Sequence, residues 1–411
     1  MMQGFFTKQQ TQSISRPDGK VHSCASCGLY QHVQSPRMVP FGNFKKRILN
    51  IGKAPDETDD EKGRPFQGRA GRRLQQEYRR LGIDLFEDCL NVNAVNCCSL
   101  DDKGQVREPT QQEIACCRNR VLKVITEYQP HIIILFGTAA VTSLIGHRWK
   151  KDLGGIMKWR GWNIPDREFK AWICPVFSPE YVEKADSPEI DVIWKSDLKQ
   201  AISMIKKPFP AFEDEEKYVE IIEAKDFMQS SLYPVPKIAA FDYETSGLKP
   251  HNKGHRIACA SVCSNEKHVQ VFMMPSNKAE RLPFLNFLAN PIIKKIAHNM
   301  KFEHAWSLVR LRQPVNGWYW DSMLAAHILD NRPGVTGLKF QVYVHFGVPD
   351  YDSEVSEYLH SNGSKSGNAF NKVLEMIKDP VKRQKLMIYC GLDSLYEFRL
   401  AKIQQEVIYG P

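Results

Sequence analysis

Apolar residues in the first half of the chain recur in two alternating patterns. Short, nearly continuous apolar runs, which are typical of buried strands, occupy 47–52, 90–95, 131–136 and 171–177. Between them, apolar residues spaced three or four positions apart predict amphipathic helices over 71–81 and 113–128. Strands alternating with helices predict a largely parallel sheet, so we expect residues 21–207 to form an α/β domain.

A second alternating pattern begins after a break rich in proline and charge. The break combines Lys206–Pro210 with the acidic run Glu213–Glu216, and we predict a linker over 208–216. Beyond it, strands are expected at 237–242, 257–263, 268–273 and 292–297, and helices at 303–309, 322–329 and 383–404. This defines a second α/β domain over 217–411. Residues 1–20 read as a polar tail, and 361–368 as a flexible loop.

Composition narrows the class of protein. The chain has 411 residues, 42% of them hydrophobic, which suits two domains. We find no apolar run long enough to span a bilayer and no convincing signal peptide, so we expect a soluble, cytoplasmic protein without a membrane partner. The formal charge is +9, and residues 1–207 hold 32 Lys and Arg against 24 Asp and Glu. Such a basic half is either a solvated surface or a binding surface for a polyanion.

Cysteines are concentrated near the N-terminus. Seven of the 11 lie between Cys24 and Cys117. In an intracellular chain these are expected to be reduced thiols or metal ligands rather than disulfides.

Three acidic signatures follow one another in the second half: Phe241–Thr245, His298–Glu303 and Tyr389–Asp393. Asp242 and Glu244 are two positions apart on a predicted strand, so their side chains share a face. Glu303 falls early in a predicted helix, and Tyr389 and Asp393 are spaced i, i+4 on another. One exposed acid is usually only a solvated surface group. Together, four carboxylates and a tyrosine suit two divalent cations, Mg²⁺ or Mn²⁺, and a water aligned for phosphodiester hydrolysis.

These signatures resemble the DEDD-type 3′–5′ exonuclease domain of family A DNA polymerases, a DnaQ-like branch of the ribonuclease H-like fold. The resemblance implies that Asp242, Glu244, Glu303 and Asp393 hold the metals, that Tyr389 is catalytic and that Asn299 contacts nucleic acid. It also implies a structural role for the segment Trp320–Leu324. The family's second motif usually ends in Asp, whereas this chain has Glu303, whose longer side chain can still bind a hard cation.

The N-terminal half carries a different set of motifs. Glycine-rich loops occupy Ile51–Asp56 and Gly63–Gly71, and they are followed by Asn93, Glu113–Cys117, Phe136–Ala140 and Phe177–Pro179. Their order and spacing resemble the family 4, iron–sulfur type of uracil-DNA glycosylase over roughly 21–205. The resemblance implies a [4Fe–4S] cluster held by Cys24, Cys27, Cys97 and Cys117. The adjacent Cys98 and Cys116 could substitute, and a zinc site or unliganded thiols are the alternatives.

The catalytic positions depart from this family. Lys53 stands where the family's loop has an acid, and Ser178-Pro179-Glu180 replaces its His-Pro-Ser motif. Phe66, which would stack on a flipped base, and Asn93, which would read its edge, are present. The resemblance therefore implies a DNA-binding domain whose glycosylase activity is degenerate, unless Asp56 or Glu57 has replaced the acid. The basic residues expected to hold DNA are Arg64, Arg69, Arg72 and Arg73.

Together these features predict a glycosylase-like α/β/α sandwich followed by a ribonuclease H-like exonuclease domain. The predicted function is proofreading with a DNA polymerase domain or subunit, by analogy in a bacteriophage and hence in the host cytoplasm. The polymerase would be a separate polypeptide or would continue a longer chain beyond Pro411. A bifunctional repair enzyme that excises uracil and a non-catalytic clamp that presents DNA are the alternatives.

Overall fold

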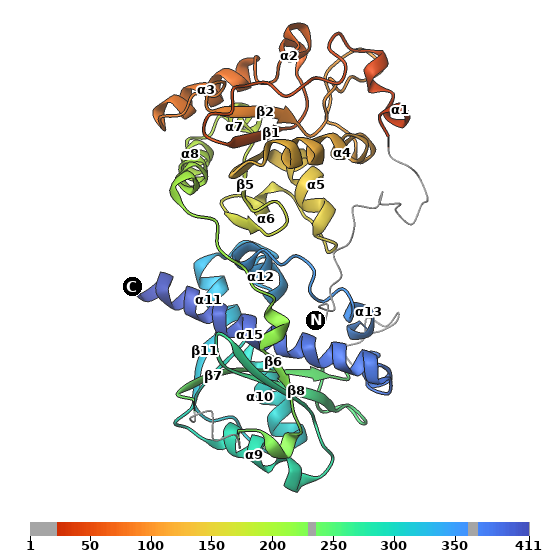
Figure 1. Ribbon diagram of the computed structural model, residues 1–411, viewed down its shortest axis with the longest axis vertical. Coiled ribbons are helices and arrows are strands. Elements are labelled where there is room, and N and C mark those ends of the chain that lie inside the picture. Colours follow the sequence, from red (N-terminus) through yellow and green to blue (C-terminus); the bar gives the residue numbers. More distant parts are fainter. Residues whose placement is uncertain (1–22, 229–235, 361–368, 411) are drawn as a thin grey trace. The chain divides into compact units, whose positions relative to one another are not determined.

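The computed structural model describes residues 23–228, 236–360 and 369–410. The predicted polar tail and the predicted loop at 361–368 lie outside these ranges. The described chain divides into two compact units, shown in Figure 1. One contains the residues up to Phe212 together with Tyr343–Pro349, and the other contains Glu213–Val342 and the residues from Asp350 onward.

The N-terminal unit is built on a five-stranded sheet of order β2-β1-β3-β5-β4. Its strands are β1 (Ile48–Gly52), β2 (Cys89–Asn93), β3 (Ile132–Phe136), β4 (Ile164–Asp166) and β5 (Ala171–Val176). All neighbours are parallel except β4, which runs antiparallel to β5. β1, β2 and β3 are buried along their whole length, as strands covered on both faces should be.

Helices connect and cover these strands. They are α1 (Cys24–Cys27), η1 (Leu29–Gln31), α2 (Glu57–Lys62), α3 (Arg69–Arg80), α4 (Gln111–Tyr128), α5 (Gly137–Arg148), α6 (Ile156–Trp159), α7 (Pro179–Ala185), α8 (Pro188–Ser203) and η2 (Met204–Lys206). α4 begins with a capping box in which Thr110 and Glu113 satisfy each other's backbone N–H groups. The core of this unit joins Tyr78, Phe136 and Trp194.

The C-terminal unit contains a six-stranded mixed sheet of order β11-β10-β7-β8-β9-β6. Its strands are β6 (Val219–Ile221), β7 (Ile238–Thr245), β8 (Ile257–Asn265), β9 (His268–Met273), β10 (Lys294–Ala297) and β11 (Trp318–Asp321). β7, β8 and β9 form an antiparallel meander, and β10 pairs with β7 and β11 in parallel.

The helices of this unit are η3 (Glu215–Tyr218), η4 (Ala224–Asp226), α9 (Lys278–Ala289), α10 (Met300–Trp306), the π-helical η5 (Ser307–Leu311), α11 (Ser322–Leu329), α12 (Leu338–Phe346) up to Val342, α13 (Ser356–Leu359), α14 (Val373–Met376) and α15 (Pro380–Tyr409). The longest, α15, packs across β7, β8 and β9 and is visible as the dark blue helix in Figure 1. This packing brings the end of the chain onto the strand that carries the first acidic signature.

The predicted strands and helices are all present, with ends shifted by a few residues. Three strands that sequence reasoning missed, β4, β6 and β11, are only three or four residues long, too short for a clear periodic signal. The predicted helix at 303–309 begins earlier, at Met300, and changes to the π-helical η5 at Ser307. No helix of the described residues is long and apolar enough to cross a membrane.

Candidate functional site

The first acidic signature lies on β7. Phe241 and Tyr243 point into the apolar core of the unit, and Asp242 and Glu244 therefore point to the opposite face. Glu244 is buried and Asp242 is partly buried. The strand thus places two carboxylates side by side, as the i, i+2 spacing predicts.

The helix α15 brings a second group of side chains to this face. Tyr389 and Asp393 are one turn apart and both buried. Ser261 on β8 donates to the carbonyl oxygen of Cys390 at 2.7 Å, which ties this turn of α15 to the sheet. One turn beyond Asp393 lies Glu397, which is 1% exposed and which sequence reasoning missed.

Glu303 completes the set from α10. The chain enters this helix through Asn299, whose positive φ of 75° marks a tight turn. Asp321 holds the turn by accepting the backbone N–H groups of Asn299 (3.1 Å) and Met300 (3.0 Å), which agrees with the structural role expected for its segment. Glu397 accepts the N–H of His298 at 3.2 Å. Glu303 itself is 2% exposed.

The carboxylates influence one another strongly. Burial, and then repulsion from Asp393, raises the pKa of Asp242 well above its ordinary value. Burial, and then repulsion from Asp242, likewise raises the pKa of Glu244, Glu303 and Glu397. Acids whose pKa is raised by burial and by repulsion from neighbouring acids form a site with a high affinity for positive charge.

The free oxygens of this cluster fit divalent cations. One oxygen each of Glu303 and Glu397 is buried without a hydrogen-bond partner among the described residues. Ligand atoms of Asp242, Glu244 and Cys390 all lie within 4.8 Å of one another. Oxygen-rich donor sets suit Mg²⁺ and Mn²⁺, so the residues present fit the metals that the sequence implies.

Two further polar residues at the site come from a segment without a recognised motif. Lys339, at the start of α12, places its Nζ 2.5 Å from Asp393 Oδ1, and Tyr351 donates to the same oxygen at 2.5 Å. Neither residue was predicted. A motif search cannot find them, because only the fold brings the segment between the second and third signatures over α15.

The predicted cluster ligands gather at α1 and α4 in the N-terminal unit. Burial raises the pKa of the Cys117 thiol to about 12, and the other three predicted ligands add to the rise because their sulfurs lie close by. Cys97 Sγ accepts the N–H of Arg37 at 3.2 Å. Burial, and then the carboxylates of Asp60 and Asp56, raises the pKa of the Cys98 thiol to about 11. For the Cys97 thiol, by contrast, Cys24 contributes to the rise in pKa.

Cys116 remains near this group. Its Sγ lies 3.5 Å from Ser26 Oγ, and it interacts with Cys27. Among the described residues, no three of these sulfurs lie within 4.8 Å of one another.

A pocket of about 220 Å³ lies beyond the ends of β1, β3 and β5. Lys53 forms ion pairs there with Glu180 (2.6 Å) and Glu108 (2.7 Å). Burial opposes its charge, but the hydrogen bonds to the two glutamates outweigh burial and raise the pKa of Lys53. Ser178 caps α7 by accepting the N–H of Tyr181. The lysine is thus cationic, and the serine has a structural role.

The two predicted base-binding residues lie beside this pocket. Asn93 is 3% exposed, and its Nδ2 has no hydrogen-bond partner among the described residues. A Cβ at Gly52 would come within 2.3 Å of Asn93 Oδ1, so only glycine leaves room for this amide. Phe66 packs edge-on against Phe136, with ring centroids 5.8 Å apart. An unpaired buried donor next to an aromatic ring can bind the edge of a planar base.

The four predicted DNA-binding arginines differ in their surroundings. Arg73 is half-buried in an ion pair with Asp191 and packs over Trp194, so it contributes to the structure. Arg64 covers the ring of Phe41. Arg69 and Arg72 are exposed at the first turn of α3, where Arg69 pairs with Glu183 and Arg72 with the Gln67 carbonyl oxygen. Arg64, Arg69 and Arg72 are all exposed, so each is available to a phosphate.

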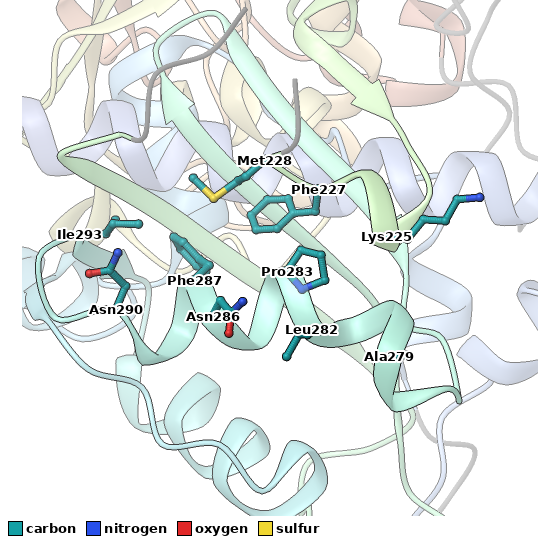
Figure 2. A pocket seen from close by; sticks show the side chains of 10 residues that line it. All are labelled: Lys225, Phe227, Met228, Ala279, Leu282, Pro283, Asn286, Phe287, Asn290 and Ile293. Carbon is teal, nitrogen blue, oxygen red and sulfur yellow. The ribbon is translucent and has the colours of Figure 1, made fainter. Parts of the chain in front are cut away.

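A larger cavity, of about 510 Å³, lies between η4 and α9. Figure 2 shows its mainly apolar lining, which includes Phe227, Met228, Pro283 and Phe287. Among the lining residues Lys225 alone is charged. The cavity contains none of the residues of the acidic signatures, so its size does not make it the catalytic site.

Two family models match adjoining parts of the chain. The uracil DNA glycosylase superfamily matches residues 39–198, and a 3′–5′ exonuclease family matches 213–408. The class is therefore a glycosylase-like domain fused to a nuclease domain. Among curated relatives, the type-4 uracil-DNA glycosylase of Thermotoga maritima is 31% identical over 191 residues, which are 46% of this chain and 92% of the relative. That of Saccharolobus solfataricus is 32% identical over 39% of this chain and 72% of the relative.

Through its N-terminal unit the chain belongs to the type-4 uracil-DNA glycosylase family, and its C-terminal unit is a 3′–5′ exonuclease domain. Solved nucleases also align with part of the chain. Brucella melitensis NrnC with bound Mg²⁺ has a TM-score of 0.31 and 19% identity, over 46% of this chain and 78% of that chain. The catalytic core of Trypanosoma brucei RRP6 has a TM-score of 0.33 and 12% identity, over 48% and 49%.

Proposed function

We propose that this protein removes nucleotides from the 3′ end of DNA by metal-dependent hydrolysis. The observation that carries the proposal is the meeting of Asp242 and Glu244 from β7, Glu303 from α10 and Asp393 from α15. Their mutual repulsion and the unpartnered oxygen of Glu303 favour cation binding.

The residues of the site divide into two roles. Asp242, Glu244, Glu303 and Asp393 would hold two Mg²⁺ or Mn²⁺ ions. The chemistry that such ions supply when bound is stabilisation of charge on the attacking and leaving oxygens of a phosphodiester. Burial, and then Asp393, raises the pKa of Tyr389 well above its ordinary value, so its phenol stays neutral. Tyr389 would therefore orient the attacking water through its hydroxyl rather than remove a proton from it.

The biological role that we assign is proofreading within a DNA polymerase system, with a polymerase domain or subunit as partner and a phage as the source. Its support is the resemblance of the three acidic signatures to the exonuclease domain of family A polymerases. A proofreading enzyme should digest a mismatched 3′ end faster than a paired one. Equal rates on both ends would argue for general trimming instead.

For the N-terminal unit we propose a [4Fe–4S] cluster held by Cys24, Cys27, Cys97 and Cys117, and DNA binding through Arg64, Arg69 and Arg72. A cluster there would crosslink α1 to α4. Uracil excision should be undetectable or very weak, because Lys53 is neutralised by two glutamates and Ser178 cannot replace a histidine.

The second candidate is a bifunctional repair enzyme, which the unpaired Nδ2 of Asn93 beside the 220 Å³ pocket favours. A uracil-containing duplex, treated with alkali after incubation, tests it in an Asp242→Ala background where exonuclease cannot obscure the product. Efficient formation of abasic sites would establish the repair enzyme, and Asp56→Ala and Glu57→Ala would then identify the acid.

The main test uses oligonucleotides labelled at either end. With Mg²⁺ or Mn²⁺, the 5′-labelled strand should give a ladder of progressively shorter products, and the 3′ label should be released at once as a mononucleotide. EDTA should stop the reaction. Digestion that persists in EDTA, or that proceeds from the 5′ end, would contradict the proposed function.

A further inference from the structure

Lys339 is a cation within a cluster of carboxylates. Its Nζ lies 2.5 Å from Asp393 Oδ1 and 2.9 Å from the Tyr351 hydroxyl oxygen. The same atom lies over the rings of Tyr351 and Tyr389, 4.1 and 4.2 Å from their centroids. The charge of Lys339 also acts on Asp242 and Glu244, whose proton affinity it lowers.

The ammonium and a metal ion compete for the same carboxylate. Asp393 is one of the four proposed metal ligands, and its Oδ1 already accepts two short hydrogen bonds, from Lys339 and Tyr351. A divalent ion at Asp393 would lie a few ångströms from a positive charge, and the repulsion between them disfavours joint occupancy. We propose that Lys339 is a positioning residue that takes the place of a cation at Asp393, and that metal loading of the exonuclease site displaces it.

The side chain is built to move. A lysine has a flexible four-carbon stem, and this one is 20% exposed, so it has a route away from the cluster. The two aromatic rings and the Tyr351 hydroxyl can keep the ammonium nearby after it leaves Asp393. Lys339 would thus stabilise the crowded acids in the metal-free protein and set the metal concentration that the enzyme needs.

The inference rests on the proposed function, and its test measures metal binding without DNA. Free Mn²⁺ would be followed by electron paramagnetic resonance during titration of the full-length protein, and binding that Asp242→Ala abolishes would be assigned to the site. Lys339→Met should tighten this binding on the order of tenfold, the size of effect expected for a residue that touches a metal ligand. The half-activating Mg²⁺ concentration in the exonuclease assay should fall in parallel.

Two variants control for charge and for local structure. Lys339→Arg keeps the cation and should bind Mn²⁺ as the wild type does. Lys382, at the exposed start of α15, has a similar contact, since its Nζ lies 2.7 Å from the Tyr358 hydroxyl. Lys382→Met should therefore leave Mn²⁺ binding unchanged. Mn²⁺ should also raise the melting temperature of Lys339→Met more than that of the wild type.

The direction in which Lys339→Met changes Mn²⁺ affinity distinguishes the proposed role of Lys339 from a purely structural one. A lysine that merely supports the structure would weaken metal binding when removed, so equal or weaker Mn²⁺ binding by Lys339→Met overturns the inference, whatever its digestion rate. If wild-type protein shows no Mn²⁺ binding that depends on Asp242, the proposed function fails and this inference falls with it. If Asp242-dependent binding exists but Lys339→Met does not tighten it, only the inference on Lys339 fails.

Discussion

The exonuclease site and the glycosylase pocket both take residues from the sheet of an α/β unit, but their charges are balanced differently. In the exonuclease site, burial and repulsion from neighbouring acids raise the pKa of the carboxyl groups, and one oxygen each of Glu303 and Glu397 has no hydrogen-bond partner among the described residues. In the second, Lys53 is paired with Glu108 and Glu180. Buried charges that lack partners within the protein indicate an external partner, whereas a neutralised group indicates a structural role.

The largest expected effect is on the rate of digestion, when a carboxylate of the exonuclease site is removed. Asp242→Ala and Asp393→Ala should each lower metal-dependent digestion by at least about 10³-fold, because several kcal/mol of charge stabilisation depend on the bound ions. The measurement is the initial rate of 3′ nucleotide release. Asp226→Ala, an exposed acid of the same unit, serves as the control. Undiminished digestion by Asp242→Ala would mean that these acids are not the catalytic site, and the comparison of the two sites would then fail.

The cluster is the feature of the N-terminal unit that should matter most for stability. Protein purified without oxygen should be brown and contain iron and sulfide, and Cys24→Ser or Cys97→Ser should bleach it. Without this crosslink, the melting temperature should fall by about 2–4 °C for each kcal/mol of stability removed.

Cys98→Ser is the matched control, because carboxylates and not the other cysteines are the groups that, after burial, raise the pKa of its thiol. It should keep both colour and iron. Stoichiometric zinc without iron, in protein never exposed to air, would mean that the cysteines hold zinc and not an iron–sulfur cluster.

A smaller effect should follow at the tyrosine. Tyr389→Phe should slow digestion by roughly 10- to 100-fold, less than most groups that transfer a proton, because Tyr389 only orients the water. The substitution should leave DNA affinity unchanged. Single-turnover rates measure the digestion step, and fluorescence anisotropy measures DNA affinity separately. Tyr319→Phe, at a more exposed ring, should behave as the wild type. A normal rate for Tyr389→Phe would mean that other groups orient the water.

The smallest effect concerns DNA binding by the glycosylase-like unit. Arg69→Glu combined with Arg72→Glu should weaken binding and reduce the salt slope by about one for each phosphate that the protein no longer neutralises. Arg79→Glu, a control at the other end of α3, should have a lesser effect. An unchanged salt slope in the double variant would mean that DNA binds elsewhere than at this end of α3.

Much of both units could be predicted from local pattern. β9 and α11 have the predicted limits, since apolar periodicity and flanking polar residues determine such elements locally. The same holds for the shared face of Asp242 and Glu244, which follows from strand geometry alone. The ion pair of Arg73 with Asp191 could not be predicted in this way, because the two residues are more than one hundred positions apart in the sequence.

The sequence by itself determined the chemistry of this protein: which acids, thiols and aromatic residues are present, and on which elements. Only the tertiary structure decided which of them meet. It placed Glu397 and Lys339 among the acids of the three signatures, brought Cys97 near Cys117, and paired Lys53 with two glutamates. The reason is physical. Periodicity orients a side chain relative to its own helix or strand, whereas contacts between distant segments depend on how those elements pack.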